Sequence, residues 1–210
     1  IEKKGKLIIP AFSVGRTQEL LYAFNQLELE RRLPDVDFYV DSPLSYEATR
    51  VVRNHPENFN ERLQNVLRHD ENPFQFNRLR FTRSVDESKM LNFKKEPCVI
   101  ISASGMAEAG RIKHHISNNI ENSRNTILMV GYCEPNSLGG RLKRRPAEVT
   151  IFGIEHEVHA EIGEITSLSA HGDYHDMLQW LDCQEPAKVS KIFLVHGEYD
   201  VQLKFADSIR

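Results

Sequence analysis

Short apolar runs alternate along this chain with segments in which apolar residues return every three or four positions. Apolar and β-branched runs bounded by polar or turn residues are typical of buried strands, whereas a 3.6-residue period is typical of helices. The pattern therefore predicts strands at residues 6–10, 37–40, 97–102 and 126–130. Each predicted strand is followed by a turn and then by a helical or irregular segment.

The segments between these strands carry helical periodicity. Apolar positions in residues 20–27 fall on one face, residues 44–70 are helical with a break at His55-Pro56, and residues 112–120 place an isoleucine every fourth position. Strands that alternate with helices favour a parallel arrangement. We therefore expect an α/β fold with a mostly parallel sheet flanked by helices.

Three other segments complete the predicted fold. Residues 71–84 have no clear period, residues 139–146 form a predicted loop rich in glycine and arginine, and residues 149–160 alternate as a hairpin with its turn near Gly153. The hairpin is the best candidate for a crossing between two domains. We place the boundary after residue 161, which gives domains 1–161 and 162–210.

Composition narrows the class of protein. The 210 residues are 40% hydrophobic and 27% charged, which is ordinary for a globular chain with a sizeable core. No apolar run is long enough to span a bilayer, and no signal peptide is visible. Three dispersed cysteines suit a reducing cytoplasm. The net charge of −3 argues against non-specific binding of nucleic acid over the whole surface, but it leaves room for a local basic cleft.

Loops after three of the strands could bind an anion. Ser13, Gly15 and Arg16 form a glycine turn before a helix, where backbone N–H groups and a guanidinium can meet a phosphate. The motif alone favours a simpler interpretation, in which Gly15 only makes the turn and Arg16 pairs with a nearby acid. The choice stays open at this point.

The second loop, residues 102–111, combines small residues with two glycines, so a ligand could approach its backbone. Ser104, Gly105 and Arg111 are its candidate binding residues, although Ser104 could equally cap the following helix. The third loop contributes Tyr132. A basic run at residues 141–145 is either a solvated face or a flank for a phosphate backbone.

Two histidines near the C-terminus stand in similar surroundings. His171 and His196 each follow a short apolar run, predicted as a strand end, and each is followed by glycine and then an acid. A helical pattern at residues 177–181 separates them. Two imidazoles at one sheet edge suggest a metal site or acid–base chemistry rather than two core histidines. The other histidines are interpreted as structural or surface residues (His114, His115, His156 and His159), and His175 stays unassigned.

Four motifs together resemble the β-CASP branch of the metallo-β-lactamase superfamily. They are the segments 12–20 and 102–111, Ser-Ala-His-Gly-Asp at 169–173 and Leu-Val-His-Gly-Glu at 194–198. That branch includes the mRNA cleavage-factor endonuclease and its prokaryotic relatives, ribonuclease J and Artemis. The resemblance covers almost all of the chain and implies a β-CASP domain followed by the returning strands of a metallo-β-lactamase αββα domain. Residues 134–140 depart from the family pattern.

The resemblance also implies roles for individual residues. His196 corresponds to the last ligand of a two-zinc site, and His171 to a histidine beside the scissile phosphate, with Asp173 and Glu198 available to orient the two rings. The strand-end loops would bind the substrate through Ser13, Gly15, Arg16, Ser104, Gly105, Arg111 and Tyr132. The main zinc motif, His-x-His-x-Asp-His, does not occur in this sequence. One histidine cannot hold a catalytic zinc, which takes about three protein ligands.

These observations lead us to expect the C-terminal half of a zinc-dependent, cytoplasmic nuclease that acts on single-stranded RNA, with no membrane association and a homodimer as one possible assembly. The sequence begins at Ile1, so further residues are expected upstream, and the 210 residues alone are expected to be inactive. One alternative is a non-catalytic homologue that binds RNA or protein. A nucleotide-binding α/β domain is weaker, because no G-x-G-x-x-G or P-loop string is present.

Overall fold

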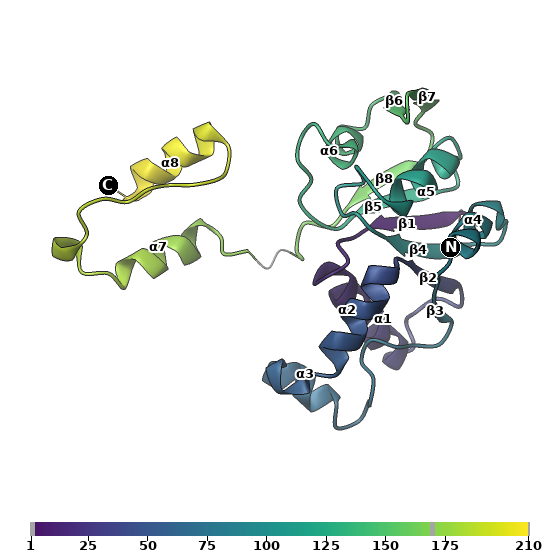
Figure 1. Ribbon diagram of the computed structural model, residues 1–210, viewed down its shortest axis with the longest axis horizontal. Coiled ribbons are helices and arrows are strands. Elements are labelled where there is room, and N and C mark those ends of the chain that lie inside the picture. The colour runs from purple at the N-terminus through teal and green to yellow at the C-terminus, as the bar shows by residue number, and fades with distance from the viewer. Residues whose placement is uncertain (1–2, 169–170, 210) are drawn as a thin grey trace. The chain divides into compact units, whose positions relative to one another are not determined.

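The computed structural model describes residues 3–168 and 171–209. The chain forms two units, residues 1–168 and 169–210, and each is described by itself. Figure 1 shows their strands and helices. Among the described residues, no helix is both long and apolar enough to cross a membrane.

A six-stranded sheet forms the centre of the first unit, in the order β3-β2-β4-β1-β5-β8. Every neighbouring pair is parallel, with Lys6 opposite Cys98 and Asp37 opposite the same residue on the other side. The prediction of a mostly parallel sheet is therefore confirmed. The strand bounds are β1 (Lys6–Pro10), β2 (Asp37–Asp41), β3 (Leu79–Phe81), β4 (Cys98–Ser102), β5 (Thr126–Met129) and β8 (Glu161–Glu164).

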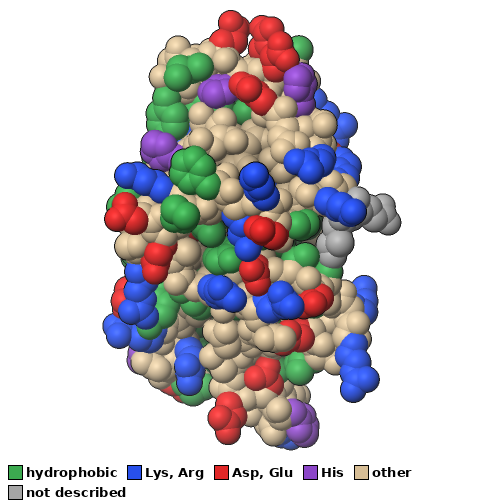
Figure 2. Space-filling view, turned by 90° about the vertical axis from the view of Figure 1, so that its right-hand side faces the viewer, with side chains coloured by type: hydrophobic (Ala, Val, Ile, Leu, Met, Phe, Trp, Pro, Cys, Tyr) green, Lys and Arg blue, Asp and Glu red, His purple; other side chains and the backbone are tan. Residues whose placement is uncertain are grey.

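Helices cover both faces of this sheet. Their bounds are α1 (Arg16–Leu29), α2 (Pro43–Arg53), α3 (Glu61–Val66), α4 (Val85–Phe93), α5 (Arg111–Asn119) and α6 (Leu138–Lys143), with a 3-10 turn at Pro56–Asn58. The break predicted at His55-Pro56 falls between α2 and this turn. The face that carries α4 and α5 shows acidic and basic side chains interspersed (Figure 2). This mixture agrees with a net charge close to zero.

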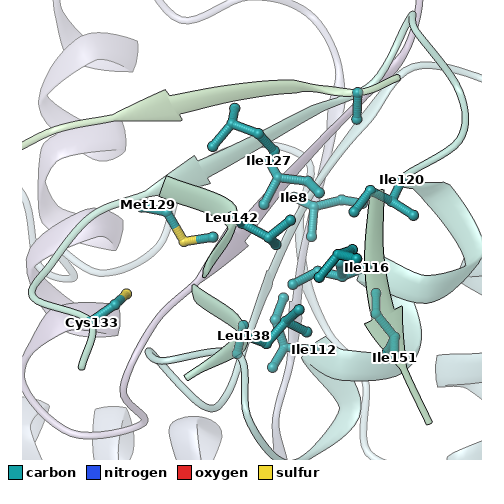
Figure 3. Close-up of a cluster of buried hydrophobic side chains, with 14 residues drawn as sticks. Ile8, Ile112, Ile116, Ile120, Ile127, Met129, Cys133, Leu138, Leu142 and Ile151 are labelled. Carbon is teal, nitrogen blue, oxygen red and sulfur yellow. The ribbon is translucent and has the colours of Figure 1, made fainter. Parts of the chain in front are cut away.

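The core has two layers because neighbouring strand residues point to opposite faces. Ile8 belongs to a cluster with α5 and α6, whereas Ile9 belongs to a cluster with α1. The first cluster includes Ile112, Ile116 and Ile120, whose fourfold spacing brings them onto one face of α5 (Figure 3). All three side chains are fully buried, so the helical period seen in the sequence is the packing face of α5.

Two predictions for the first unit were wrong. Residues 139–146 were expected to be a loop, but Leu138–Lys143 is helix α6. Ser137 caps this helix by accepting the Gly140 N–H at 3.1 Å, and the buried Leu138 and Leu142 lie one turn apart. In the segment 71–84, expected to be irregular, residues 79–81 form edge strand β3. Helix α6 was not predicted because its segment is rich in glycine, and strand β3 was not predicted because it is short.

The predicted hairpin is confirmed. Strands β6 (Glu148–Ile151) and β7 (Ile154–Glu157) pair antiparallel, and Gly153 in the turn has φ 78°. Strand β8 follows the hairpin and joins the main sheet beside β5. The compact first unit therefore continues to Leu168, while the proposed division of the family's two domains after residue 161 stays a prediction.

The second unit contains helices α7 (Tyr174–Asp182) and α8 (Tyr199–Ile209) and a 3-10 turn at Pro186–Lys188. The helix expected at residues 177–181 is confirmed. Strands were expected to lead into His171 and His196, but residues 165–168 and 189–195 carry no strand, and Ser169 and Ala170 lie outside the described residues. A strand needs a neighbour for its N–H and C=O groups. Residues 171–209 include no strand and no buried residue, so no such neighbour is present there.

Candidate functional site

The parallel sheet brings the loops after its strands to one edge. Strands β1, β2, β4 and β5 all run in the same direction, so the segments after Pro10, Asp41, Ser102 and Met129 leave the sheet at the same end. In open α/β sheets, ligands bind outside this carboxyl end of the strands. The candidate binding residues at positions 13–16, 104–111 and 132 therefore all lie at this edge of the sheet.

Direct contacts join these loops. The hydroxyls of Ser13 and Ser42 lie 3.1 Å apart, which ties the loop after β1 to the loop after β2. A Cβ atom at Gly105 would lie 2.7 Å from the ring of Phe12, so the loop after β4 can approach the loop after β1 only because residue 105 is glycine. The Cys133 sulfur lies 3.7 Å from the Gly105 carbonyl oxygen. We call this contiguous set of loops the strand-end site.

At the start of α1, the sequence left two interpretations open, and the structure shows the contacts of the simpler one. Gly15 has φ 82°, and its N–H donates to Gln18 Oε1 at 2.7 Å. The Thr17 hydroxyl donates to the Phe12 carbonyl at 2.7 Å. The Arg16 guanidinium pairs with Glu19, one turn along the helix. A role for Arg16 in binding substrate stays a prediction, and it would require exchange of this partly exposed ion pair.

Arg111 connects the end of the loop after β4 to the neighbouring strand β2 and to Arg83. Its guanidinium lies 2.7 Å from Asp41 Oδ1 and donates to the Arg83 carbonyl at 2.9 Å. Ser104 does not cap α5, because Gly110 occupies the cap position and has φ 81°. The structure therefore places Arg111 beneath the loop in a structural ion pair, and its predicted contact with substrate stays untested.

Asp41 is the centre of a buried polar network that the sequence did not predict. Its carboxylate is fully buried at the end of β2 and accepts hydrogen bonds from His115 Nε2 at 2.6 Å and Ser88 Oγ at 2.5 Å. Thr82 and Arg111 are further donors. Burial alone would raise the pKa of Asp41, but these hydrogen bonds, led by that of His115, outweigh burial and lower the pKa to about 2.

This network holds the strand-end site together. Its members come from β2, the segment after β3, α4 and α5, which are distant in sequence. A carboxylate with that many donors stays ionised and fixed in the interior. The sequence signal that could have located it is an acid at the carboxyl end of a strand, in Asp41-Ser42-Pro43.

Apolar side chains are exposed on the loops of the strand-end site. Tyr132 is 64% exposed and Phe12 is 46% exposed, although each lies within three residues of the end of a strand in the core. Exposed aromatic faces accept nucleobases by stacking without regard to sequence. The sequence singled out Tyr132 as a binding residue and included Phe12 only as part of a motif, so Phe12 is the candidate that sequence reasoning missed.

The basic run beside the site is partly engaged within the protein. Lys143 pairs with Glu164, and Arg144 donates to the Pro135 carbonyl at 2.6 Å. Arg141 lies 3.5 Å from the Thr150 carbonyl oxygen. These residues belong to α6 and its end, so the run is a helix face with internal partners and not an open basic loop.

In the second unit, His171 and His196 are both exposed. His196 has φ 68°, and its carbonyl accepts from Gln202 Nε2 at 2.7 Å. The Asp173 side chain caps α7 by accepting the N–H groups of His175 at 2.8 Å and Asp176 at 3.0 Å, so it serves the helix start. Ser169 and Ala170 of the first histidine motif lie outside the described residues.

The described residues do not contain a complete binding site for a zinc ion. Within residues 3–168 and 171–209, no group of three or more histidine, cysteine, aspartate or glutamate side chains is placed to hold a metal. His196 is a chemically suitable donor, but a zinc needs about three protein ligands. Further ligands would have to come from residues outside the described part of this sequence.

Comparison with known proteins gives two family matches. Residues 17–142 match the Beta-Casp domain, and residues 155–210 match the Zn-dependent metallo-hydrolase RNA specificity domain. The first match includes the loops after β2, β4 and β5, and the second includes both C-terminal histidines. The motifs at 102–111, 169–173 and 194–198 therefore lie within the two matched ranges, and the motif at 12–20 overlaps the start of the first.

Individual relatives agree with these matches. A ribonuclease of Thermus thermophilus is 34% identical over 94% of this chain and 44% of its own length. The RNase J-like protein of Methanocaldococcus jannaschii is 32% identical over 100% of this chain and 47% of its own length. The transcription termination factor FttA of Methanosarcina mazei is 26% identical over 100% of this chain and 33% of its own length. The chain thus spans less than half the length of each of these relatives.

Proposed function

Because the chain belongs to the β-CASP family of the metallo-β-lactamase superfamily, we propose that the whole protein is a zinc-dependent nuclease that hydrolyses phosphodiester bonds in single-stranded RNA. The observation that carries this proposal is the strand-end site, where two of the family motifs, residues 12–20 and 102–111, meet at one edge of the sheet beside the loop after β5. RNA is preferred over DNA because two of the relatives are named as ribonucleases and the second family match is described as an RNA specificity domain.

Substrate binding is assigned to the strand-end site. Tyr132 supplies an exposed ring for a base, and Arg16 supplies a guanidinium that can leave Glu19 for a phosphate. Ser13, Ser104 and Gly105 contribute hydroxyls and a close approach of backbone. Arg111 holds the loop from below through Asp41 and would reach substrate only at the edge of that loop.

The reaction itself is assigned to the C-terminal unit together with the rest of the protein. His196 is proposed as one zinc ligand, with Glu198 near it in sequence to orient the ring, and the other ligands of a two-zinc site come from the part of the relatives that this chain does not match. His171, with Asp173 two residues later, is proposed to hold a proton for the leaving oxygen. The 210 residues alone are accordingly proposed to be inactive, and the whole protein to act in the cytoplasm.

One observation favours a second candidate, a non-catalytic protein that binds RNA or another protein. Several relatives carry the name of a transcription termination factor rather than that of a nuclease. In that case the strand-end site would bind RNA as proposed, and His171 and His196 would have no chemical role. A homodimer is compatible with either candidate.

The deciding experiment measures zinc content and RNA cleavage of the whole protein and of His196→Ala. We expect about two zinc ions per chain in the unsubstituted protein, less metal in the variant, and a loss of cleavage of about 100-fold or more. The matched control is His159→Ala, because His159 is an exposed histidine on the segment after the hairpin, where it pairs with Glu157.

Two outcomes would contradict the nuclease proposal. A whole protein that holds no zinc and cleaves no RNA would establish the binding candidate. A protein that cleaves RNA equally well with His196→Ala would remove His196 from the metal site. Binding of RNA is measured alongside cleavage, so that the two candidates are separated in the same samples.

A further inference from the structure

A groove lies beside the strand-end site, between α4 and the start of α5. It runs between α4, residues 108–110, the first turns of α5 and the tip of the β6–β7 hairpin, and its volume is about 610 Å³. That volume is within the range of small-molecule sites, about 300–1,000 Å³. We call it the α4–α5 groove. The side chains that matter for the argument are Lys89, Phe93, Lys113, His114 and Phe152.

Two exposed phenylalanines line the groove. Phe93, the last residue of α4, is 74% exposed, and Phe152, in the hairpin turn, is 51% exposed. The His114 ring stacks on Phe152 with centroids 4.6 Å apart, and Lys113 Nζ lies 5.2 Å from the centroid of the same ring. His114 and Lys113 both lie against the Phe152 ring, so the three side chains form an aromatic surface that carries a cation, which is the combination that binds a base of a single strand.

The charge of the groove suits phosphate. Lys89, Lys113 and Arg111 line it against a single acid, Glu108. Glu108 accepts the Leu138 N–H at 2.5 Å and lies 3.4 Å from Lys113 Nζ, so its charge is already engaged. Arg111 is likewise committed to Asp41. Within the described part of the chain, Lys89 makes no ion pair, which leaves its ammonium available for a phosphate.

The groove is continuous with the strand-end site through one loop. Gly105 packs against Phe12 in the strand-end site, and the same loop continues to Glu108 and Gly110, which line the groove. A nucleic-acid strand that lies over the loop after β4 therefore reaches the groove within a few residues of that loop. Continuity of this kind favours the substrate strand itself as the occupant over an unrelated protein segment.

We propose that the α4–α5 groove binds nucleotides of single-stranded RNA that extend from the strand-end site. Bases stack on Phe93 and on the His114–Phe152 pair, and Lys89 meets a phosphate. This inference rests on RNA being the ligand of the proposed function, but it does not require that the RNA be cleaved. The groove lengthens the path over which the protein holds an RNA strand.

The test measures equilibrium binding of a labelled single-stranded RNA of about 20 nucleotides to the whole protein, at fixed salt and under conditions that prevent cleavage. Phe93→Ala and Phe152→Ala are each expected to raise Kd about tenfold, the size of one lost base–aromatic stack. Lys89→Gln is expected to raise Kd and to lower the slope of log K against log salt by about one.

Matched controls come from the same helix and its end. Met90→Ala removes a large apolar side chain that is 65% exposed on α4, and Lys95→Gln removes an exposed cation just beyond α4; neither residue lines the groove. Both are expected to leave Kd unchanged. Thermal unfolding of every variant checks that the fold is intact. Crosslinking of RNA that contains 4-thiouridine is expected to label peptides with Phe93 or Phe152.

The outcomes separate this inference from the proposed function. Unchanged Kd in all three groove variants, with crosslinks confined to the strand-end loops, would overturn the groove and leave the nuclease intact. Weakened RNA binding in the groove variants of a protein that cleaves nothing would support the groove while the proposed catalysis fails. Loss of a protein partner in these variants, with RNA binding unaffected, would also overturn the inference.

Discussion

The two units of this chain contain similar amphipathic helices in opposite circumstances. On α5, Ile112 and Ile116 are fully buried against the sheet. On α7, Trp180 is 67% exposed and Met177 is 43% exposed, and Phe193 in the following segment is 80% exposed. Residues 171–209 contain no buried position at all. The difference lies in whether a surface is present for the apolar face to cover.

This contrast shows what an amphipathic pattern specifies and what it leaves open. A periodic apolar face predicts a helix, but burial requires a second element of complementary shape. The first unit supplies that element in its six-stranded sheet. The second unit matches a domain that, in the relatives, is accompanied by more than half of a longer chain. We therefore expect its apolar faces to be covered in the whole protein.

The largest expected effect on stability comes from comparing two alanine substitutions, each made in the 210-residue chain. Ile116→Ala is expected to lower the free energy of unfolding by about 4 kcal/mol, because it removes a fully buried side chain from a packed core. Phe193→Ala is expected to change it by less than about 0.5 kcal/mol, since that ring is in water. Urea unfolding measures both values.

The Phe193→Ala substitution is then repeated in the whole protein. There Phe193→Ala is expected to become destabilising by about 3 kcal/mol if the second unit is covered by the remainder of the chain. Equal and small effects in both chains would show that Phe193 stays exposed. A large effect already in the 210-residue chain would show that the second unit has a core of its own.

A smaller difference is expected from glycines with positive φ. Gly110 has φ 81° and ψ −172°, a conformation that only glycine adopts readily, and a Cβ there would lie 2.5 Å from the Ala103 carbonyl oxygen. Gly110→Ala should therefore cost about 3 kcal/mol of unfolding free energy. Gly197→Ala, at φ 90° in open space in the second unit, meets no clash and should cost only about 1–2 kcal/mol. Comparable losses from the two variants would refute the distinction.

The smallest expected effect is a dependence on acid. The folded-state pKa of Asp41, about 2, is below the usual value of 3.8, so Asp41 stabilises the fold above pH 4 and loses this contribution as the pH falls towards 2. The contribution is about 2 kcal/mol. Asp37 and Glu108 also have lowered pKa values and add to the same decline.

The contribution of Asp41 to this pH dependence is measured by comparing the unsubstituted chain with Asp41→Asn. Unfolding free energies of the unsubstituted chain and of Asp41→Asn, measured from pH 6 to pH 2.5, are expected to converge as the pH falls. Asp176→Asn, in the start of α7, changes an exposed carboxylate of the second unit and serves as the control. Two parallel curves for Asp41→Asn and the unsubstituted chain would show that Asp41 is not the stabilising group.

Short-range sequence patterns were sufficient to predict most of the helices and strands of the first unit. Strands β1 and β4 and helix α5 were predictable because apolar runs and a fourfold period report directly on burial. Helix α6 was missed because Gly139 and Gly140 weaken helix propensity, while its stability comes from the Ser137 cap and two buried leucines. Strand β3 was missed because three residues give no period.

The candidate site was predictable only in part. The loops carrying Ser13, Ser104 and Tyr132 could be placed at one edge, because consecutive parallel strands end there. The buried partners of Asp41 could not be, because His115 is 74 positions away in sequence and reaches it only in the folded sheet. The strands expected before His171 and His196 failed for a related reason, since strand formation depends on a neighbour that no local pattern reveals.

The order of strands also sets the timing of folding during synthesis. Strand β1 lies between β4 and β5, and its first residue, Lys6, pairs with Cys98. Ribosomes add about 5–20 residues per second, so β4 is synthesised roughly 5–20 s after β1. An apolar strand that waits so long is exposed to aggregation. Nascent chains of this protein are therefore expected to depend on chaperones until β4 has emerged.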